Sequence, residues 1–270
     1  MPEKKRLPIW LRLIRAGVIA YAALALFACT MADKLIFFPP RTGYVATAPG
    51  LVTFQTSKGE SIAALNYPAQ AGKPTLLYSH GNAEDIGGSV SLYQDWRDDG
   101  WGVLAYDYPG YGHSSGRPTA PSAERAIEAA WQFLTTDQGV DPASIILVGR
   151  SVGGGPSTSL LAKHRPAGLV LISPFTSAYE VRPPAQHFLP GNRFQNLKRV
   201  QKSDVPLLVI HGENDGIIPV SHGRAVFDAS PSEQKHFVAI TDSGHNDLFY
   251  NASPQIMEEI RRFVAQVTRE

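Results

Sequence analysis

The feature that most constrains the fold of this chain is an alternation of short apolar runs with longer segments of helical periodicity. It begins near residue 51 and continues to the C-terminal region. Such an alternation is typical of a mostly parallel sheet flanked by helices, and continuously apolar runs are expected of strands buried on both faces. The sequence therefore predicts an α/β fold. The expected strands are residues 51–55, 61–67, 75–79, 102–107, 144–148, 168–172, 206–210 and 235–240, the first two as an antiparallel hairpin.

Three segments between and after these runs are expected to be helical. Apolar residues recur at helical spacing over 121–135, which predicts a helix with one face on the sheet. A second helical stretch is expected over 156–164. In the last segment Ser253 is a natural N-cap and Pro254 lies in the first turn, so a terminal helix is predicted to begin there.

Length and charge limit the possible classes of protein. A chain of 270 residues with 43% hydrophobic content can form one globular domain with a full core. The formal net charge is +1, but the first 28 residues carry +4 and the remainder carries −3. A mildly acidic body lacks the clustered Lys and Arg side chains that neutralise phosphates, so nucleic acid is not an expected partner. The single cysteine, Cys29, excludes an intramolecular disulfide.

The N-terminus has the layout of a secretory signal, with a basic region over 4–15 followed by an uncharged apolar run over 16–28. Thirteen apolar residues are too few to cross a hydrocarbon core of roughly 30 Å, which needs about 20. Residues 26–29 resemble the lipobox of bacterial lipoproteins, which makes Cys29 the candidate lipidation site and predicts a bacterial cell-envelope protein. The alternative is an uncleaved anchor ending near Ala32, with Arg12 and Arg15 snorkelling to the membrane surface. Both interpretations attach the protein to a membrane.

The motif that carries chemistry is Gly149-Arg150-Ser151-Val152-Gly153, which follows an apolar run and precedes a helical stretch. A G-x-S-x-G sequence between a strand and a helix is typical of a nucleophile elbow, where a sharp turn exposes the serine hydroxyl. The alternative is an ordinary glycine-rich connection. In the first case Ser151 is the nucleophile.

A serine hydroxyl needs a base within hydrogen-bond reach and an acid that orients the base. Asp215 and His245 each follow an apolar strand, in the order Ser, acid, His that this kind of elbow favours. Because open α/β sheets place their sites at strand exits, we predict Asp215 as the acid and His245 as the base. The acids left as alternatives are Glu213, Asp242 and Asp247. The remaining histidines, at 80, 113, 164, 187, 211, 222 and 236, are expected to be packed, surface or turn residues.

Two backbone donors are needed for the oxyanion of a tetrahedral intermediate. One is expected from Val152, the residue after the nucleophile, and the other from the loop after the third strand. Asn82 is the predicted second donor, with Ala83 as the next choice. The sequence contains no H-E-x-x-H motif, no paired cysteines and no phosphate loop, so no metal or organic cofactor is expected.

Several motifs together resemble the α/β-hydrolase superfamily. They are Ser79-His80-Gly81-Asn82-Ala83-Glu84-Asp85, Asp107-Tyr108-Pro109-Gly110-Tyr111-Gly112, Ser115-Gly116-Arg117-Pro118, the elbow, His211-Gly212 through Asp215, and Gly244-His245-Asn246. The chain looks most like the membrane-associated branch, which includes eukaryotic acyl-protein thioesterases and many bacterial hydrolases. The resemblance implies an α/β-hydrolase fold. A lipobox-like segment replaces the cysteine-rich N-terminus of the eukaryotic enzymes, so a depalmitoylating role does not transfer with it.

The sequence thus predicts 1–28 as a signal peptide or membrane anchor, 29–50 as a tether and lead-in, and 51–270 as an α/β-hydrolase catalytic domain. Only residues 176–204 separate the sixth and seventh strands, so any lid is small. Pro183, Pro184, Phe188, Leu189 and Pro190 in this insert are candidates for lining an acyl pocket.

The predicted function is a serine hydrolase that cleaves carboxylic esters or thioesters through an acyl-enzyme on Ser151, with a lipid or an acylated protein as possible substrate. One alternative is a serine aminopeptidase-type peptidase, for which Glu180 and Asp204 are the carboxylates available in the insert. The other is a non-catalytic, membrane-tethered binding protein on the same scaffold.

Overall fold

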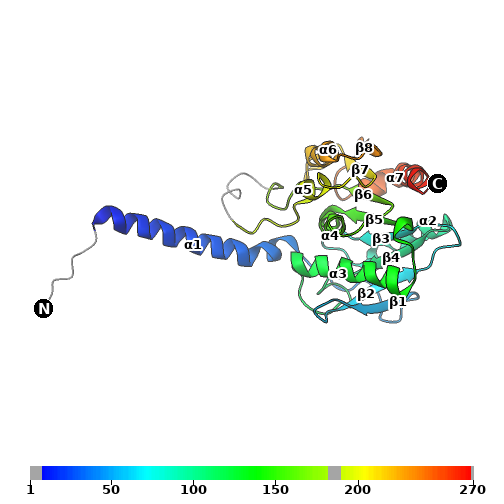
Figure 1. Ribbon diagram of the computed structural model, residues 1–270, viewed down its shortest axis with the longest axis horizontal. Coiled ribbons are helices and arrows are strands. Elements are labelled where there is room, and N and C mark those ends of the chain that lie inside the picture. The colour runs from blue at the N-terminus through cyan, green and yellow to red at the C-terminus, as the bar shows by residue number, and fades with distance from the viewer. Residues whose placement is uncertain (1–7, 182–189, 269–270) are drawn as a thin grey trace.

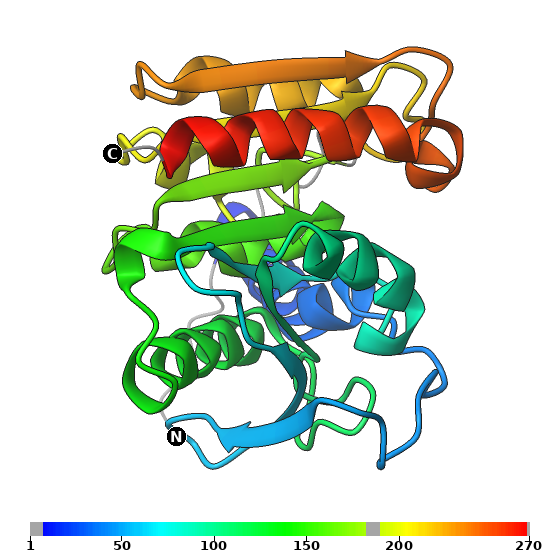
Figure 2. The same ribbon diagram turned by 90° about the vertical axis from the view of Figure 1, so that its right-hand side faces the viewer.

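The computed structural model describes residues 8–181 and 190–268, and within them eight strands form one twisted sheet (Figures 1 and 2). Their order is β1-β2-β4-β3-β5-β6-β7-β8. β2 runs in the direction opposite to the other seven strands and pairs antiparallel with β1 and β4. This confirms the predicted mostly parallel sheet with an antiparallel opening hairpin. The strands are β1 (Leu51–Gln55), β2 (Ser61–Tyr67), β3 (Thr75–Ser79), β4 (Gly102–Tyr106), β5 (Ile145–Arg150), β6 (Gly168–Ile172), β7 (Leu207–Gly212) and β8 (Lys235–Ile240).

Helices cover both faces of the sheet, and each face has its own apolar core. Successive side chains of a strand point to opposite faces, so Leu147 joins one core while Val148 joins the other. The helices that contribute to the first core are α3 (Ala120–Gln132), α4 (Gly154–Leu160), α5 (Asn196–Val200) and α6 (Val220–Ala229). The helices of the second core are α2 (Val90–Asp98) and α7 (Leu248–Val267).

The predicted strands are found at their expected positions, with β5 and β7 extending farther than predicted. β5 extends to Arg150 because Gly149 and Arg150 still pair with β6, and β7 extends to Gly212 because it pairs with β8 to the end. Both strands therefore run up to the residues that carry the predicted site.

The helix boundaries differ more from the predictions. α3 begins at Ala120, capped by the Thr119 hydroxyl, and gives way at Phe133 to a five-residue π-helical turn. α4 ends at Leu160, four residues before its predicted end.

The predicted start of the terminal helix at Ser253 coincides with a break inside α7, and a further helical turn that the sequence did not indicate precedes it. α7 begins at Leu248 and is kinked at Ala252, whose φ and ψ of −136° and 22° are non-helical. Pro254, which lacks the N–H of a helical ladder, is the physical reason for the kink.

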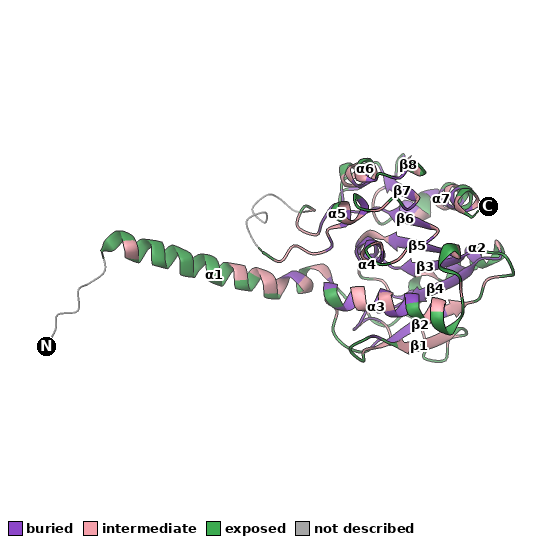
Figure 3. Cartoon of the chain, viewed as in Figure 1, coloured by how far each residue is buried: buried purple, intermediate pink, exposed green. Residues whose placement is uncertain are grey.

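The N-terminal helix α1 (Ile9–Ile36) projects away from the domain, and most of its residues are exposed (Figures 1 and 3). The predicted division at residues 28 and 29 does not interrupt the helix, which continues through Cys29 to Ile36. Its 28 residues correspond to about 42 Å, compared with the thirteen-residue apolar run considered from sequence.

The turn between β5 and α4 packs against the end of β3. A Cβ on Gly153 would lie 2.8 Å from the carbonyl oxygen of His80 and closer still to that of Ser79. A glycine at this position lets the two backbones touch. The loops after β3 and β5 are therefore held side by side.

We predict that Gly153→Ala destabilises the protein by about 1–3 kcal/mol, because the added methyl group collides with backbone atoms that cannot move independently. Gly154→Ala is the matched control, since a Cβ there meets nothing closer than a Leu171 methyl group at 3.5 Å. Urea unfolding of both variants in detergent checks the difference. Equal stability of the two variants would contradict the close packing of the turn against β3.

Candidate active site

Ser151 lies at the tip of a sharp turn immediately after β5. Its φ of +51° is in the left-handed region, which is strained for a non-glycine residue. The short 3-10 turn Ser151–Gly153 then leads directly into α4. This is the strand, turn and helix sequence predicted for a nucleophile elbow, and it places the hydroxyl at the carboxyl edge of the sheet.

His245 lies between Ser151 and Asp215, although the three residues come from separate loops. The Nε2 atom of His245 is 2.9 Å from the Ser151 Oγ, and its Nδ1 atom is 2.7 Å from the Asp215 Oδ2. With Nδ1–H donating to the carboxylate, Nε2 accepts the serine O–H. The structure thus brings together all three predicted residues in the geometry of a nucleophile, a base and an orienting acid.

Asp215 is fully buried and is surrounded by donors. Its Oδ1 accepts the backbone N–H groups of Ile217 at 2.9 Å and Ile218 at 2.7 Å. Burial works to raise the pKa of Asp215, but hydrogen bonds from His211, His245 and the Ile218 backbone outweigh it and hold the pKa well below its usual range. The carboxyl group is therefore ionised wherever the protein is folded near neutral pH.

His211 is part of this arrangement, whereas the sequence assigned it only to turn geometry. Its Nε2 lies 2.8 Å from the Ile218 carbonyl oxygen and 3.3 Å from the Asp215 Oδ2, and its side chain is fully buried. It therefore fixes the loop that carries Asp215. The signal for this role was its position at the end of β7, four residues before the acid.

None of the alternative acids contacts His245. Glu213 and Asp242 are exposed, and Asp242 lies in a left-handed turn. Asp247 accepts the backbone N–H of Gly244 at 2.7 Å, so it shapes the loop that holds the base. Asp215 is the acid that the geometry supports.

The other histidines have different neighbours. His164 stacks on Trp131, His113 lies against Tyr44, and the Nδ1 of His222 lies 2.9 Å from the Thr176 hydroxyl. His236 faces Glu259, and His187 lies outside the described residues. None of the described ones approaches Ser151.

The loop after β3 lies beside the turn that carries Ser151. Within the described part of the chain, the backbone N–H of Asn82 has no hydrogen-bond partner, whereas that of Ala83 donates to the Asn82 Oδ1 at 2.9 Å. This distinguishes the two candidate donors and favours Asn82. Val152 is buried next to the nucleophile, and all three residues line the same cavity.

That cavity has a volume of about 340 Å³ and opens directly over Ser151. Its polar side holds His245, Asn246 and the ion pair of Glu84 with Arg150. Its apolar side consists of Leu35, Ile36, Phe38, Phe175, Ala178, Val181, Ile217 and Ile218. The cavity therefore combines polar and apolar lining residues around the Ser151 hydroxyl.

The insert between β6 and α5 supplies Ala178 and Val181 to this cavity. Of the residues that the sequence suggested for an acyl pocket, Pro183, Pro184, Phe188 and Leu189 lie outside the described residues. Pro190 is exposed, and its carbonyl accepts the Tyr179 hydroxyl. The sequence did not indicate the contribution of residues 35–38, which come from the end of α1.

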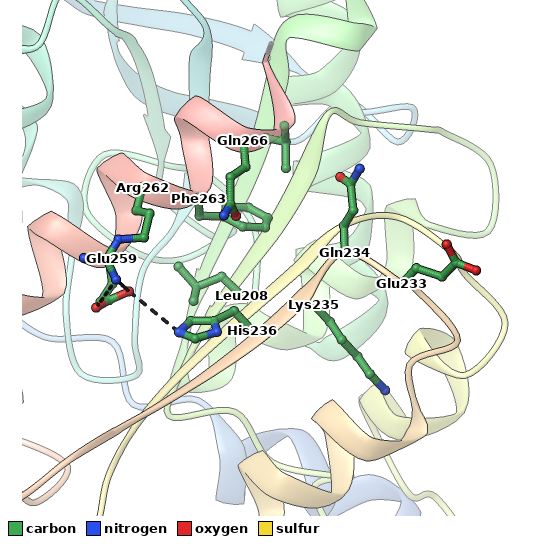
Figure 4. A pocket seen from close by; sticks show the side chains of 10 residues that line it. Leu208, Glu233, Gln234, Lys235, His236, Glu259, Arg262, Phe263 and Gln266 are labelled. Atoms are coloured by element: carbon green, nitrogen blue, oxygen red, sulfur yellow. Dashed lines mark hydrogen bonds and ion pairs between the residues drawn. The ribbon is translucent and has the colours of Figure 1, made fainter. Parts of the chain in front are cut away.

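A larger hollow of about 480 Å³ lies between α7 and the amino end of β8 (Figure 4). Its walls include His236 and Arg262, both facing Glu259. His245 follows the carboxyl end of β8, so this hollow lies at the opposite end of the strand from the site. Among the described residues, no group of three or more His, Cys, Asp or Glu side chains is placed to hold a metal ion.

Comparison with known proteins indicates the family to which the chain is related. Residues 70–196 match the family model of the serine aminopeptidases, S33. The chain is 37% identical over 215 residues to human alpha/beta hydrolase domain-containing protein 17B, which covers 78% of this chain and 74% of the human protein. The 17C protein of mouse is 36% identical over 199 residues, covering 73% of this chain and 61% of the mouse protein.

Solved structures of esterases have the same fold. The esterase of Pyrococcus furiosus superposes with a TM-score of 0.71 at 15% identity, covering 86% of this chain and 98% of the esterase. A Rhodococcus esterase gives a TM-score of 0.64 at 18% identity, covering 81% and 99% respectively. At these identities the likeness concerns the fold.

Proposed function

The chain belongs to the α/β-hydrolase superfamily, and we propose that it is a serine hydrolase that cleaves carboxylic esters or thioesters through an acyl-enzyme on Ser151. The observation that carries this proposal is the position of His245, within hydrogen-bond reach of both Ser151 and Asp215. A metal or organic cofactor is not required for this chemistry.

In the first half-reaction the Ser151 Oγ attacks the substrate carbonyl while the His245 Nε2 takes its proton. His245 becomes an imidazolium, which the buried and ionised Asp215 stabilises through Nδ1–H. The developing oxyanion accepts hydrogen bonds from the backbone N–H groups of Val152 and Asn82. His245 then gives its proton to the leaving alcohol or thiol, and the acyl group stays on Ser151.

In the second half-reaction water replaces the leaving group. His245 takes a proton from the water as it attacks the acyl-enzyme, and returns that proton to Ser151 when the acid product departs. The same imidazole therefore serves both halves. The open cavity over Ser151 leaves room for water to enter.

The walls of the cavity favour an acyl substrate over an aminoacyl substrate. A peptidase that binds a free amino terminus needs an unpaired carboxylate near the nucleophile. The acidic side chain in the described wall, Glu84, is paired with Arg150 and also accepts the backbone N–H of Gly81. Of the insert carboxylates, Glu180 accepts the Ser177 hydroxyl and Asp204 pairs with the exposed Arg165. The apolar lining residues of the same cavity are suited to a hydrocarbon chain.

We also propose that α1 holds the protein at a membrane. The segment from Ile9 to Met31 precedes the first fully buried residue, Ala32, and corresponds to about 35 Å of helix. This length exceeds a hydrocarbon core of roughly 30 Å, with Arg12 and Arg15 near one end. Lipid attachment at Cys29 is the alternative mode of anchoring.

The first prediction from the proposed function concerns covalent catalysis by Ser151. The purified protein in detergent is expected to react covalently with a fluorophosphonate probe and to hydrolyse p-nitrophenyl esters, and Ser151→Ala should lose both activities. A panel of ester chain lengths, with aminoacyl p-nitroanilides alongside, measures the preference. Hydrolysis of the anilides in place of the esters would support the peptidase, and a folded wild type that neither labels nor turns over would support the binding protein.

The second prediction concerns the acid. Asp215→Asn should keep the fold but reduce kcat about 10⁴-fold, because His245 loses the partner that sets its tautomer. Glu213→Gln is the matched control, since Glu213 is exposed two residues earlier in the same loop. Ester turnover and unfolding midpoints are measured for both. Near-wild-type turnover by Asp215→Asn would require a different acid.

The third prediction concerns the anchor. If α1 spans the bilayer, Cys29→Ser should stay with the membrane fraction through an alkaline carbonate wash, as the wild type does, and be released only by detergent. Immunoblots of the washed membranes measure this. Release of the variant into the wash would establish lipid attachment at Cys29 as the anchoring mode.

A further inference from the structure

The end of α1 is fixed to the domain beside the cavity. Phe37, only 4% exposed, packs edge-on against the rings of Tyr108, Tyr111 and Phe194 at centroid distances of 6.0–6.3 Å. One turn earlier, Asp33 accepts the backbone N–H of Ala120 at 3.0 Å and pairs with Arg193. The end of the helix is therefore held by the ring contacts of Phe37 and by the polar contacts of Asp33.

The Asn82 side chain makes a third contact with this segment. Its Oδ1 accepts the backbone N–H of Phe38 at 2.9 Å, and its Nδ2 donates to the carbonyl oxygen of Ile36 at 2.5 Å. The primary amide of Asn82 thus pairs with a backbone group of Ile36, the last residue of α1, and with one of Phe38, two residues later. Such a two-point contact fixes the orientation of the amide as well as its position.

The same side chain holds its own loop. The Asn82 Oδ1 also accepts the Ala83 N–H and the Tyr111 hydroxyl, each at 2.9 Å. Burial raises the pKa of Tyr111, so its phenol stays protonated and able to donate. Ala83 is held at a φ of +54°, which is strained for alanine and requires support from neighbouring contacts.

These contacts converge on Asn82, which lines the cavity and whose backbone N–H has no hydrogen-bond partner within the described residues. We infer that Asn82 is a positioning residue whose side chain ties the end of α1 to the oxyanion loop, so that residues 36–38 form a structural part of the catalytic site. The inference rests on the proposed function, since it assigns a role to the loop in that reaction. The side chain acts through its own backbone N–H and does not contact the substrate oxyanion.

The first experiment separates positioning from the donor itself, because Asn82→Ala keeps the backbone N–H. In the full-length protein in detergent, kcat for a p-nitrophenyl ester should fall by about 10- to 100-fold, with KM and the pH dependence of kcat/KM unchanged. Asn82→Asp should recover part of kcat, since a carboxylate still accepts from Phe38, Ala83 and Tyr111. Asn66→Ala on β2, away from this cavity, is the matched control.

The second experiment tests the partner. Phe38→Pro removes the N–H that Asn82 accepts, and the extended φ and ψ of Phe37, −105° and 125°, are compatible with a following proline. Phe38→Ala removes the ring but keeps the N–H. We expect Phe38→Pro to lower kcat well below that of Phe38→Ala. The double variant Asn82→Ala with Phe38→Pro should be no worse than Asn82→Ala with Phe38→Ala, which has lost the same ring.

Hydrogen exchange of the same variants gives a readout apart from activity. In Asn82→Ala, peptides covering residues 35–38 and 81–83 should exchange faster, while the strands of the sheet exchange as in the wild type. Two results would overturn the inference. One is an Asn82→Ala variant with kcat within about twofold of wild type. The other is a loss of kcat on replacing Phe38→Ala by Phe38→Pro that is as large in the Asn82→Ala background as in the wild-type background.

Failure of this inference is distinguishable from failure of the proposed function. If the wild type reacts with the fluorophosphonate and turns over esters while Asn82→Ala matches it, only the positioning role is lost. If the wild type itself is inert, the hydrolase proposal is lost, and exchange of the two segments alone reports whether they are coupled.

Discussion

The close approach of the turn after β5 to the end of β3 is the constraint on which the site depends. Gly153 allows the backbone behind Ser151 to lie directly against the carbonyl groups of Ser79 and His80. Because β3 and β5 are neighbours in the parallel sheet, the loops that follow them leave the sheet at the same edge. The turn that carries Ser151 and the loop that carries Asn82 are therefore adjacent before any side chain is considered, and both residues line the same cavity.

The second constraint on the site is that the buried carboxylate of Asp215 needs hydrogen-bond donors. A carboxylate removed from water is costly unless it is hydrogen-bonded, and each oxygen of Asp215 has donors from its own loop or from β7. The loop after β7 and His211 thus surround the charge with donors in addition to His245, which comes from the loop after β8. Because His211 and two backbone N–H groups already hold the carboxylate, His245 supplies one contact among several and is free to exchange its proton with Ser151.

The sequence predicted the sheet and the residues Ser151, Asp215 and His245 because local sequence patterns determine both. Apolar runs specify buried strands, and a strand exit in a parallel sheet determines where the next side chain lies, so Ser151, Asp215 and His245 could be placed without knowing any contact between them. Ser253 and Pro254 predicted the start of the helical run that follows the break at Ala252. The turn before that break was not predicted, because it is held by the burial of Leu248. His211 was overlooked because its hydrogen-bond partners are set by the fold of the loop that follows it.

The apolar lining of the cavity was not predictable, for a different reason. Leu35, Ile36 and Phe38 belong to a segment that reads as an anchor and tether, and nothing local connects it to a serine more than a hundred residues later. The connection is made by tertiary contacts: the buried ring of Phe37, the pairing of Asp33 with Arg193, and the amide of Asn82. Since Leu35, Phe38 and Ile217 remain 52–68% exposed at the edge of the same cavity, a helix that leaves the domain here carries an apolar surface from its own exposed turns to the nucleophile. The proposed acyl substrate would therefore meet apolar side chains beside Ser151, and the two-point contact at Asn82 ties the segment that supplies them to the loop after β3.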